Sequence, residues 1–264
     1  MIVKDLGQMP ESIVLFGGAY GNLQAVQAVT AIADGRPMIN TGDMVAYCAD
    51  GADVVRALAE VPCVAGNVEK QLASGADNCG CGFEAGTVCD LLSAGWYAHA
   101  KASLGAAELA VMRACPDVIV FAQAGLRFAV LHGGVSDVAR FLWSVSPEAA
   151  FAEELRLLTA ACGPVDAVVA GHSGIAFQKD VGGVTWINAG VIGMPPNDGG
   201  QSTEYVVLQD GQPHFHRLAY DAAGARAAMV SAGLTQGYHD ALITGRWPSE
   251  DVLPQALRTR DLAV

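Results

Sequence analysis

The sequence lacks a long uninterrupted apolar segment. Its most apolar stretch, residues 117–134, is broken by Gln123 and Arg127, and it therefore predicts two strands rather than a membrane-spanning helix. No apolar run precedes Gly7, so we expect no secretory signal. Together these absences predict a cytoplasmic protein that does not associate with a membrane.

Positive charge is also scarce. The chain has 15 Lys and Arg residues against 27 Asp and Glu residues, which gives a formal net charge of −12. The basic residues form no cluster, so we expect no nucleic-acid partner, and a locally positive site would have to come from a metal ion. A content of 52% hydrophobic and only 16% charged residues is typical of a compact, well-buried protein.

Internal repeats, low-complexity tracts and clear linkers are missing as well. The length of 264 residues is sufficient for a large core. We therefore predict one domain over residues 1–264, with a helical tail from about residue 221.

The cysteines argue against a disulfide framework, because seven is an odd number in a chain predicted to be cytoplasmic. Cys79 and Cys81 lie in a Gly-rich loop predicted for residues 73–87, and Cys89 follows it. Thiolates are strong, soft metal ligands, so these three cysteines could form a metal site. The Cys-x-Cys spacing differs, however, from the usual Cys-x₂-Cys spacing of zinc sites.

Short apolar runs alternate along the chain with segments of helical pattern. Predicted strands cover residues 13–16, 38–40, 61–65, 127–131, 167–170 and 184–188, and residues 204–209 and 213–218 predict a hairpin with an Asp-Gly turn. Predicted helices cover residues 23–33 after a capping Asn22, residues 53–59, and a segment to about residue 161 with Ser146 as cap and Pro147 at its first position. This alternation predicts an α/β fold, in which ligands collect at the carboxyl ends of the strands.

Polar residues beside glycine stand at the ends of these predicted strands, in the segments 18–22, 42–43, 66–69, 132–133 and 171–174. Four of the strand ends carry an oxygen or nitrogen donor: Asp43, Asn67, His132 and His172. A divalent transition metal accepts this mixture of donors. The alternative is that each residue only forms hydrogen bonds at a strand end, since a Gly-Asp pair alone is usually a turn or a helix cap.

These segments, together with residues 187–193 and 216–221, resemble the calcineurin-like metallophosphoesterase superfamily, and most of all its small prokaryotic phosphodiesterase branch. The resemblance covers residues 13–242. It implies an α/β/β/α sandwich of two mixed sheets flanked by helices, and hydrolysis of a small phosphate ester or nucleotide. Self-association into a homo-oligomer is a further expectation by analogy.

The resemblance also implies a degenerate metal site. The family holds two adjacent metals, and one set of ligands is retained here in full: Asp43, Asn67, His132 and His172. The other set shares Asp43, but its remaining positions are Gly18, Tyr20 and Gly174. We therefore expect one divalent transition metal (Mn, Fe or Zn) and no second one.

Two further substitutions concern catalysis. Val68 stands where the family has a histidine that protonates the leaving oxygen, and valine cannot do so. Tyr20 is expected to fill the space left by the missing metal. The alternatives for its phenol are a hydrogen bond to an anion or weak ligation as phenolate.

Three hypotheses follow, and none assigns a catalytic residue. The first is a divergent metal-dependent phosphoesterase that hydrolyses phosphodiesters or phosphomonoesters with one of two metal sites retained. The second is an inactive pseudoenzyme that binds a ligand or a partner. The third is an enzyme of different chemistry that uses the loop of Cys79 and Cys81.

Overall fold

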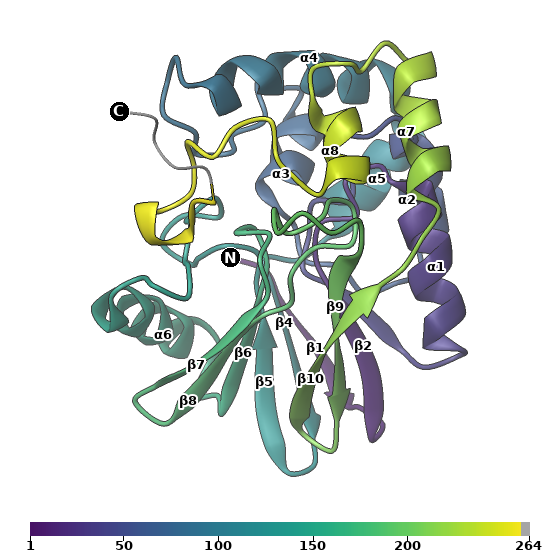
Figure 1. The fold of residues 1–264 in the computed structure, drawn as a ribbon. Helices are drawn as coiled ribbons and strands as arrows, with labels where there is room; N and C mark the ends of the chain where they lie inside the picture. Colours follow the sequence, from purple (N-terminus) through teal and green to yellow (C-terminus); the bar gives the residue numbers. More distant parts are fainter. Residues whose placement is uncertain (260–264) are drawn as a thin grey trace.

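Two β-sheets pack face to face between layers of helices in the computed structural model, which describes residues 1–259 (Figure 1). The last five residues of the single domain predicted over 1–264 lie outside this described part. The arrangement confirms the predicted α/β/β/α sandwich of two mixed sheets flanked by helices. No helix within residues 1–259 is both long and apolar enough to cross a membrane.

The larger sheet has six strands in the described residues, in the order β1 (Val3–Gln8), β4 (Val118–Gln123), β5 (Leu126–Val130), β6 (Ala167–Ala170), β8 (Val184–Asn188) and β7 (Phe177–Val181). The smaller sheet has four, in the order β10 (Gln212–Leu218), β9 (Thr203–Gln209), β2 (Ser12–Phe16) and β3 (Met38–Asn40). The strands β5, β6 and β8 are parallel to one another, as are β2 and β3. Parallel neighbours end at the same edge of their sheet, which gathers the loops that follow them.

The strands β2, β4, β5 and β6 are buried on both faces, because the other sheet covers one face and helices cover the other. In β2, Ile13 and Leu15 point into the core between the sheets, whereas Val14 and Phe16 pack against helices. The same alternation in β4 places Ile119 between the sheets. Successive side chains alternate between the two faces, and because both faces are buried, these segments are continuously apolar in the sequence.

The helices cover the outer faces of the two sheets. They are α1 (Leu23–Ala33), α2 (Gly51–Ala57), α3 (Asn67–Ser74), α4 (Val88–Ser103), α5 (Ala106–Ala114), α6 (Glu148–Cys162), α7 (Ala222–Ser231) and α8 (Tyr238–Thr244), with a short 3₁₀ helix, η1 (Gln255–Leu257). The helix α6 buries Phe151 and Leu158 against the larger sheet. The helices α1, α2, α4, α7 and α8 contribute to one core, in which α1 lies beside the smaller sheet while α4 and α8 lie above the upper ends of the strands in Figure 1.

Several elements confirm the sequence predictions. The helix α1 has the predicted bounds, and Asn22 caps it by accepting a hydrogen bond from the N–H of Ala25 at 3.1 Å. The strands β9 and β10 form the predicted hairpin, and residues 117–134 contain two strands. The helical tail begins with α7, which Asp221 caps.

Other predictions are wrong. Residues 61–65 form only one isolated bridge to β3, because Pro62 has no N–H and the N–H of Ala65 donates instead to the carbonyl of Pro116. Ser146 does not cap α6, since its Oγ accepts from the N–H of Trp143 at 2.9 Å. The sequence also failed to predict β1, β7, α3, α4 and α5, and the first two residues of the loop predicted for 73–87 belong to α3.

Candidate metal centre

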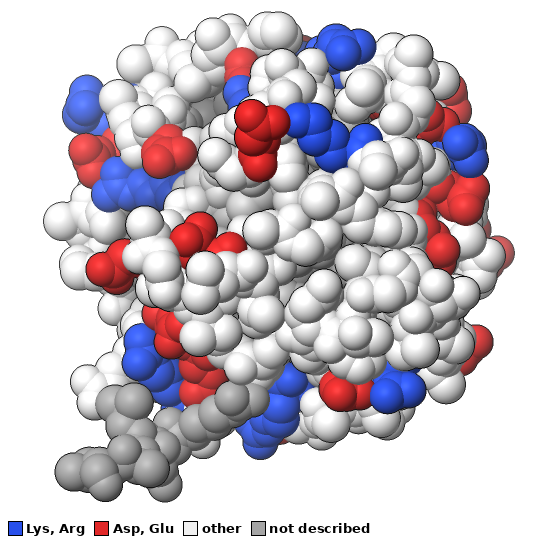
Figure 2. Space-filling model, turned by 90° about the horizontal axis from the view of Figure 1, so that it is seen from above, with Lys and Arg blue, Asp and Glu red and all other residues white. Residues whose placement is uncertain are grey.

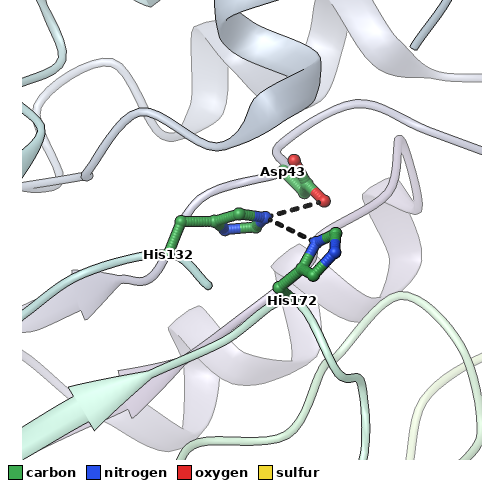
Figure 3. Close-up of side chains that lie close together, drawn as sticks. All are labelled: Asp43, His132 and His172. Atoms are coloured by element: carbon green, nitrogen blue, oxygen red, sulfur yellow. Dashed lines mark hydrogen bonds and ion pairs between the residues drawn. The ribbon is translucent and has the colours of Figure 1, made fainter. Parts of the chain in front are cut away.

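Three side chains from separate strand ends converge on one point (Figure 3). Asp43 follows β3, His132 follows β5 and His172 follows β6, and all three are buried. The Nε2 of His132 lies 3.3 Å from Asp43 Oδ2 and 3.1 Å from His172 Nδ1. The three ligand atoms lie within 4.8 Å of one another.

Asn67, the first residue of α3, completes this group. Its Nδ2 donates a hydrogen bond to the carbonyl of Cys79 at 2.9 Å, which fixes the orientation of the amide. The Oδ1 atom therefore faces inward and lies 3.0 Å from His132 Nε2. The structure thus brings together all four residues that the sequence analysis proposed as ligands.

The protonation of His132 shows what the group requires. Its Nδ1 lies 2.7 Å from the carbonyl oxygen of Thr41, and because a carbonyl only accepts, Nδ1 carries a proton. In neutral His132 the Nε2 atom is then a lone pair that faces other acceptors. A cation at this point, either a proton on Nε2 or a metal ion, would attract the lone pairs of Nε2, Asp43 Oδ2 and Asn67 Oδ1 together.

The spacing of these atoms fits a metal ion. Ligand atoms about 2.1 Å from a metal lie about 3.0 Å apart at octahedral angles and about 3.4 Å apart at tetrahedral angles. The three distances from His132 Nε2, between 3.0 and 3.3 Å, fall in this range. The contact between His132 and the Thr41 carbonyl supplies the support that histidine ligands commonly have on their other ring nitrogen.

The electrostatics of the site keep its donors available. Burial opposes ionisation of Asp43, but the neighbouring His132 outweighs it and holds the pKa of the carboxyl below its usual value. Burial and the positive charge of His132 lower the pKa of His172 to about 3, so this imidazole stays neutral. For His132, burial lowers the pKa, but Asp43 more than compensates and the net shift is upward.

Glu69 holds the backbone around the ligands. Its fully buried carboxylate accepts hydrogen bonds from three backbone N–H groups: those of Asp43 (2.8 Å), Met44 (2.7 Å) and Gly66 (2.8 Å). It thereby ties the loop after β3 to the start of α3. Burial and the nearby charge of Asp43 raise the pKa of Glu69 to about 7.

The backbone adopts an uncommon conformation at two of the ligands. Asp43 (φ 58°) and His172 (φ 59°) lie in the left-handed region, which non-glycine residues seldom occupy. Gly42 precedes Asp43, and a Cβ there would lie 2.7 Å from His132 Nδ1 and 2.9 Å from the N atom of Gly66. The glycine is therefore required for the close approach of these loops.

The three degenerate positions pack against one another. A Cβ on Gly18 would lie only 2.5 Å from Cζ of the Tyr20 ring, and a Cβ on Gly174 would lie 4.0 Å from the Tyr20 Oη. The ring thus occupies the space in front of Gly18 and reaches towards Gly174. Burial and the charge of Asp43 raise the pKa of the phenol well above its usual value, so Tyr20 is not a phenolate here.

Val68 offers no proton to a leaving group. Its side chain is 1% exposed and packs in the core, while its backbone N–H lies 3.3 Å from Asp43 Oδ1 and donates to it. Asp43 therefore caps the N-terminus of α3 with one oxygen and faces His132 with the other.

Cys79 and Cys81 form a disulfide in the structure. The odd number of cysteines had indicated no disulfide framework, and this single bond joins two cysteines only two residues apart. It lies beside Asn67, whose amide donates to the carbonyl of Cys79. Bonded sulfurs are not thiolates, and burial raises the pKa of the Cys89 thiol. With Cys79 and Cys81 bonded to each other, a thiolate metal site at the three cysteines would require this disulfide to be reduced, and it stays a prediction.

A pocket opens beside the centre, with an empty volume of about 630 Å³ that is partly open to solvent. Asp43, His172 and Tyr20 reach it, together with aromatic residues that no sequence motif singled out. Two of these, Trp143 and Trp247, come from segments without family motifs, so only the folded chain could reveal them. Seen from above in Figure 2, the molecule has a largely uncharged middle, with Lys and Arg scattered among Asp and Glu.

Comparisons with known proteins agree with this architecture. The family model for the calcineurin-like phosphoesterase superfamily domain matches residues 13–211. No curated protein sequence matches the chain. A solved metallophosphoesterase from Sphaerobacter thermophilus is 20% identical, with a TM-score of 0.69 over 90% of this chain and 99% of that one. A hypothetical protein, PH1004, from Pyrococcus horikoshii is 13% identical, with a TM-score of 0.70 over 88% of this chain and 97% of that one.

At these identities the solved structures support the fold alone. The family match covers most of the chain, and the chain therefore belongs to the calcineurin-like phosphoesterase superfamily.

Proposed function

We propose that this member of the superfamily is a metal-dependent phosphoesterase with one divalent transition metal, held by Asp43, Asn67, His132 and His172. The observation that carries the proposal is the convergence of Oδ2, Oδ1 and Nδ1 acceptors on His132 Nε2 at 3.0 to 3.3 Å. Mixed oxygen and nitrogen donors favour Mn, Fe or Zn over Ca or Mg. The substrate would be a small phosphate ester or nucleotide.

The chemistry divides between the metal and the chain. When bound, the metal would polarise a phosphate oxygen and activate a coordinated water. The chain orients the ligands, since Thr41 fixes the tautomer of His132 and Cys79 fixes the amide of Asn67. Glu69 holds the two loops that carry Asp43 and Asn67.

We propose that no second metal binds. The Tyr20 ring lies where a side chain on Gly18 would have to stand, and neither Gly18 nor Gly174 has a donor atom. Because Val68 also lacks a proton to donate, we expect slow turnover. General acid catalysis typically raises the rate by about 10²–10⁴-fold, and Val68 cannot supply this contribution.

A ligand-binding pseudoenzyme is the second candidate. The buried packing of Val68 favours it, because this side chain is part of the core rather than open to a substrate. In this case the metal, the pocket and the fold would serve binding without hydrolysis.

Turnover distinguishes the two candidates. Protein loaded with Mn is assayed with p-nitrophenyl phosphate and with bis(p-nitrophenyl) phosphate. The phosphoesterase proposal expects slow hydrolysis of at least one ester that His172→Ala abolishes and that His214→Ala, at an exposed position, retains. Equal rates for the His172→Ala variant and the parent would contradict it, and no hydrolysis by metal-loaded protein would favour the pseudoenzyme.

A further inference from the structure

The pocket beside the metal centre has an aromatic wall that starts at a proposed ligand. The ring of Phe141 lies 4.2 Å from the imidazole of His172, measured between centroids. Trp143 continues this wall, with its ring stacked parallel to that of Phe141 at 5.4 Å and an interplanar angle of 3°. Phe83 also stacks with Phe141, at 6.3 Å. A group of stacked aromatic rings therefore lines the pocket next to the metal site.

Three tyrosines also line the pocket. Tyr47 packs edge-on against Tyr20 at 4.8 Å and contacts Tyr238 at 4.4 Å. Burial raises the pKa of Tyr47 and of Tyr238, so both rings are neutral. These rings add further aromatic surface and no charge.

Residues 246–258, which we term the C-terminal strap, close the pocket. Trp247 is anchored by its backbone N–H, which donates to Asn197 Oδ1 at 2.8 Å, and by its indole Nε1, which donates to the carbonyl of Pro195 at 2.6 Å. Val252 of the same strap also lines the pocket. The strap lies beyond residue 211, where the family match ends, so this wall lies outside the matched family domain.

The charge in the pocket is unusual for a site that binds phosphate. Among the described residues that line it, none is Lys or Arg, and Asp43 is the one carboxylate. Any attraction for a phosphate would therefore come from the metal. The remainder of a ligand would meet aromatic and aliphatic surface, and few polar partners.

We propose that the pocket binds the aryl group of a phosphate ester, with the phosphate directed at the metal centre. This inference rests on the proposed function. An apolar aryl group fits better than a nucleobase, because the lining is mostly aromatic and aliphatic and offers the polar edge of a base few hydrogen-bond partners besides tyrosine and serine hydroxyls. The C-terminal strap then determines which esters bind.

Binding rather than turnover tests this inference. Metal content is measured first, and phenyl phosphate, methyl phosphate and AMP are then titrated calorimetrically into the Mn-loaded protein. Because all three carry the same type of phosphate group, differences in affinity report the attached group. We expect phenyl phosphate to bind at least about tenfold more tightly than methyl phosphate, from burial of the ring. Equal affinities, no binding of either, or tighter binding of AMP than of phenyl phosphate would overturn the inference.

Variants of the C-terminal strap test whether the aryl group binds in this pocket. Val252→Trp fills the pocket and should reduce the preference for phenyl over methyl phosphate to nearly none, whereas Val230→Trp, on the exposed face of α7, should retain it. Trp247→Ala should weaken the preference and Trp247→Phe should keep most of it. If Val252→Trp keeps the full preference, the aryl group binds elsewhere and the inference is wrong.

Metal analysis tests the proposed function independently of the aryl pocket. If the function is wrong, the sample contains no bound metal. In that sample indole replaces the esters as a neutral aromatic probe. Saturable indole binding that Val252→Trp abolishes supports the pocket, and the absence of saturable binding overturns it.

Discussion

His132 and Asn67 are 65 residues apart in the sequence, yet Nε2 of the first lies 3.0 Å from Oδ1 of the second. Oδ1 is an acceptor, and so is Nε2 of neutral His132, because Nδ1 carries the proton and donates a hydrogen bond to the carbonyl of Thr41. The chain holds this pairing with buried hydrogen bonds on both sides. Two acceptors this close favour a positive charge between them, as a proton on Nε2 or as a metal ion.

Removal of the proposed Asn67 ligand atom, Oδ1, should weaken metal binding. Asn67→Leu loses the Oδ1 atom and also the bond from Nδ2 to the Cys79 carbonyl. We expect the metal affinity to fall by at least about tenfold, because loss of even an outer partner of a ligand costs this much. A competition titration with a chelating dye measures it. Asn78→Leu, at an exposed position, is the matched control, and an unchanged affinity of the Asn67→Leu variant would exclude this ligand.

Glu69→Gln should destabilise the loops that carry the ligands. In the variant, an NH₂ group replaces one of the two acceptor oxygens. This donor then faces backbone N–H donors, which lose their hydrogen-bond acceptor. The free energy of unfolding should fall by about 1–3 kcal/mol. Urea denaturation of the metal-free protein gives this value, with Glu148→Gln at an exposed position as control. Equal stability of the two variants would argue against a positioning role for Glu69.

Two variants at Tyr20 separate packing from chemistry. If the ring only fills space, Tyr20→Phe should leave both metal content and stability nearly unchanged. Tyr20→Ala should cost about 3–5 kcal/mol, as truncation of other buried aromatic side chains does. Thermal denaturation and metal analysis measure the two effects. Loss of metal from Tyr20→Phe would instead assign the phenol a role as ligand or donor.

Metal affinity should fall as the pH falls. The pKa of His132 is raised above its ordinary value, since Asp43 outweighs burial, so below that pKa a proton occupies Nε2 and competes with the metal. The pKa of about 3 at His172 means that this residue adds no competition between pH 5 and 8. The apparent affinity for Mn should thus drop by about tenfold per pH unit at the acidic end of this range. A flat profile would show that His132 is not a ligand.

The strand ends could be found from the sequence because the two features that mark them, an apolar run and a polar residue beside glycine, are adjacent in the chain. An apolar run followed by Gly-Asp or Gly-His marks the position of Asp43 or His172, whatever the rest of the chain does. The hairpin of β9 and β10 was predicted for the same reason, from its Asp-Gly turn. Convergence of the four donors required the resemblance to a family, since it depends on contacts between distant segments.

Elements without a local pattern were missed. The strand β1 is mostly exposed, and Lys4 and Asp5 give it no apolar alternation, so its parallel pairing with β4 is a tertiary effect. Trp247 reaches the pocket only because the C-terminal strap folds back to Asn197 and Pro195. Spacing in the sequence says nothing about such a contact.

Metal content per chain tests the central claim most directly. The protein is purified without added metal and without a metal-binding tag, and its Mn, Fe and Zn are measured by mass spectrometry before and after incubation with each ion. The account predicts about one equivalent per chain, lost in His172→Ala and retained in His214→Ala. No bound metal under any of these conditions, or an equal amount in His172→Ala, would contradict it.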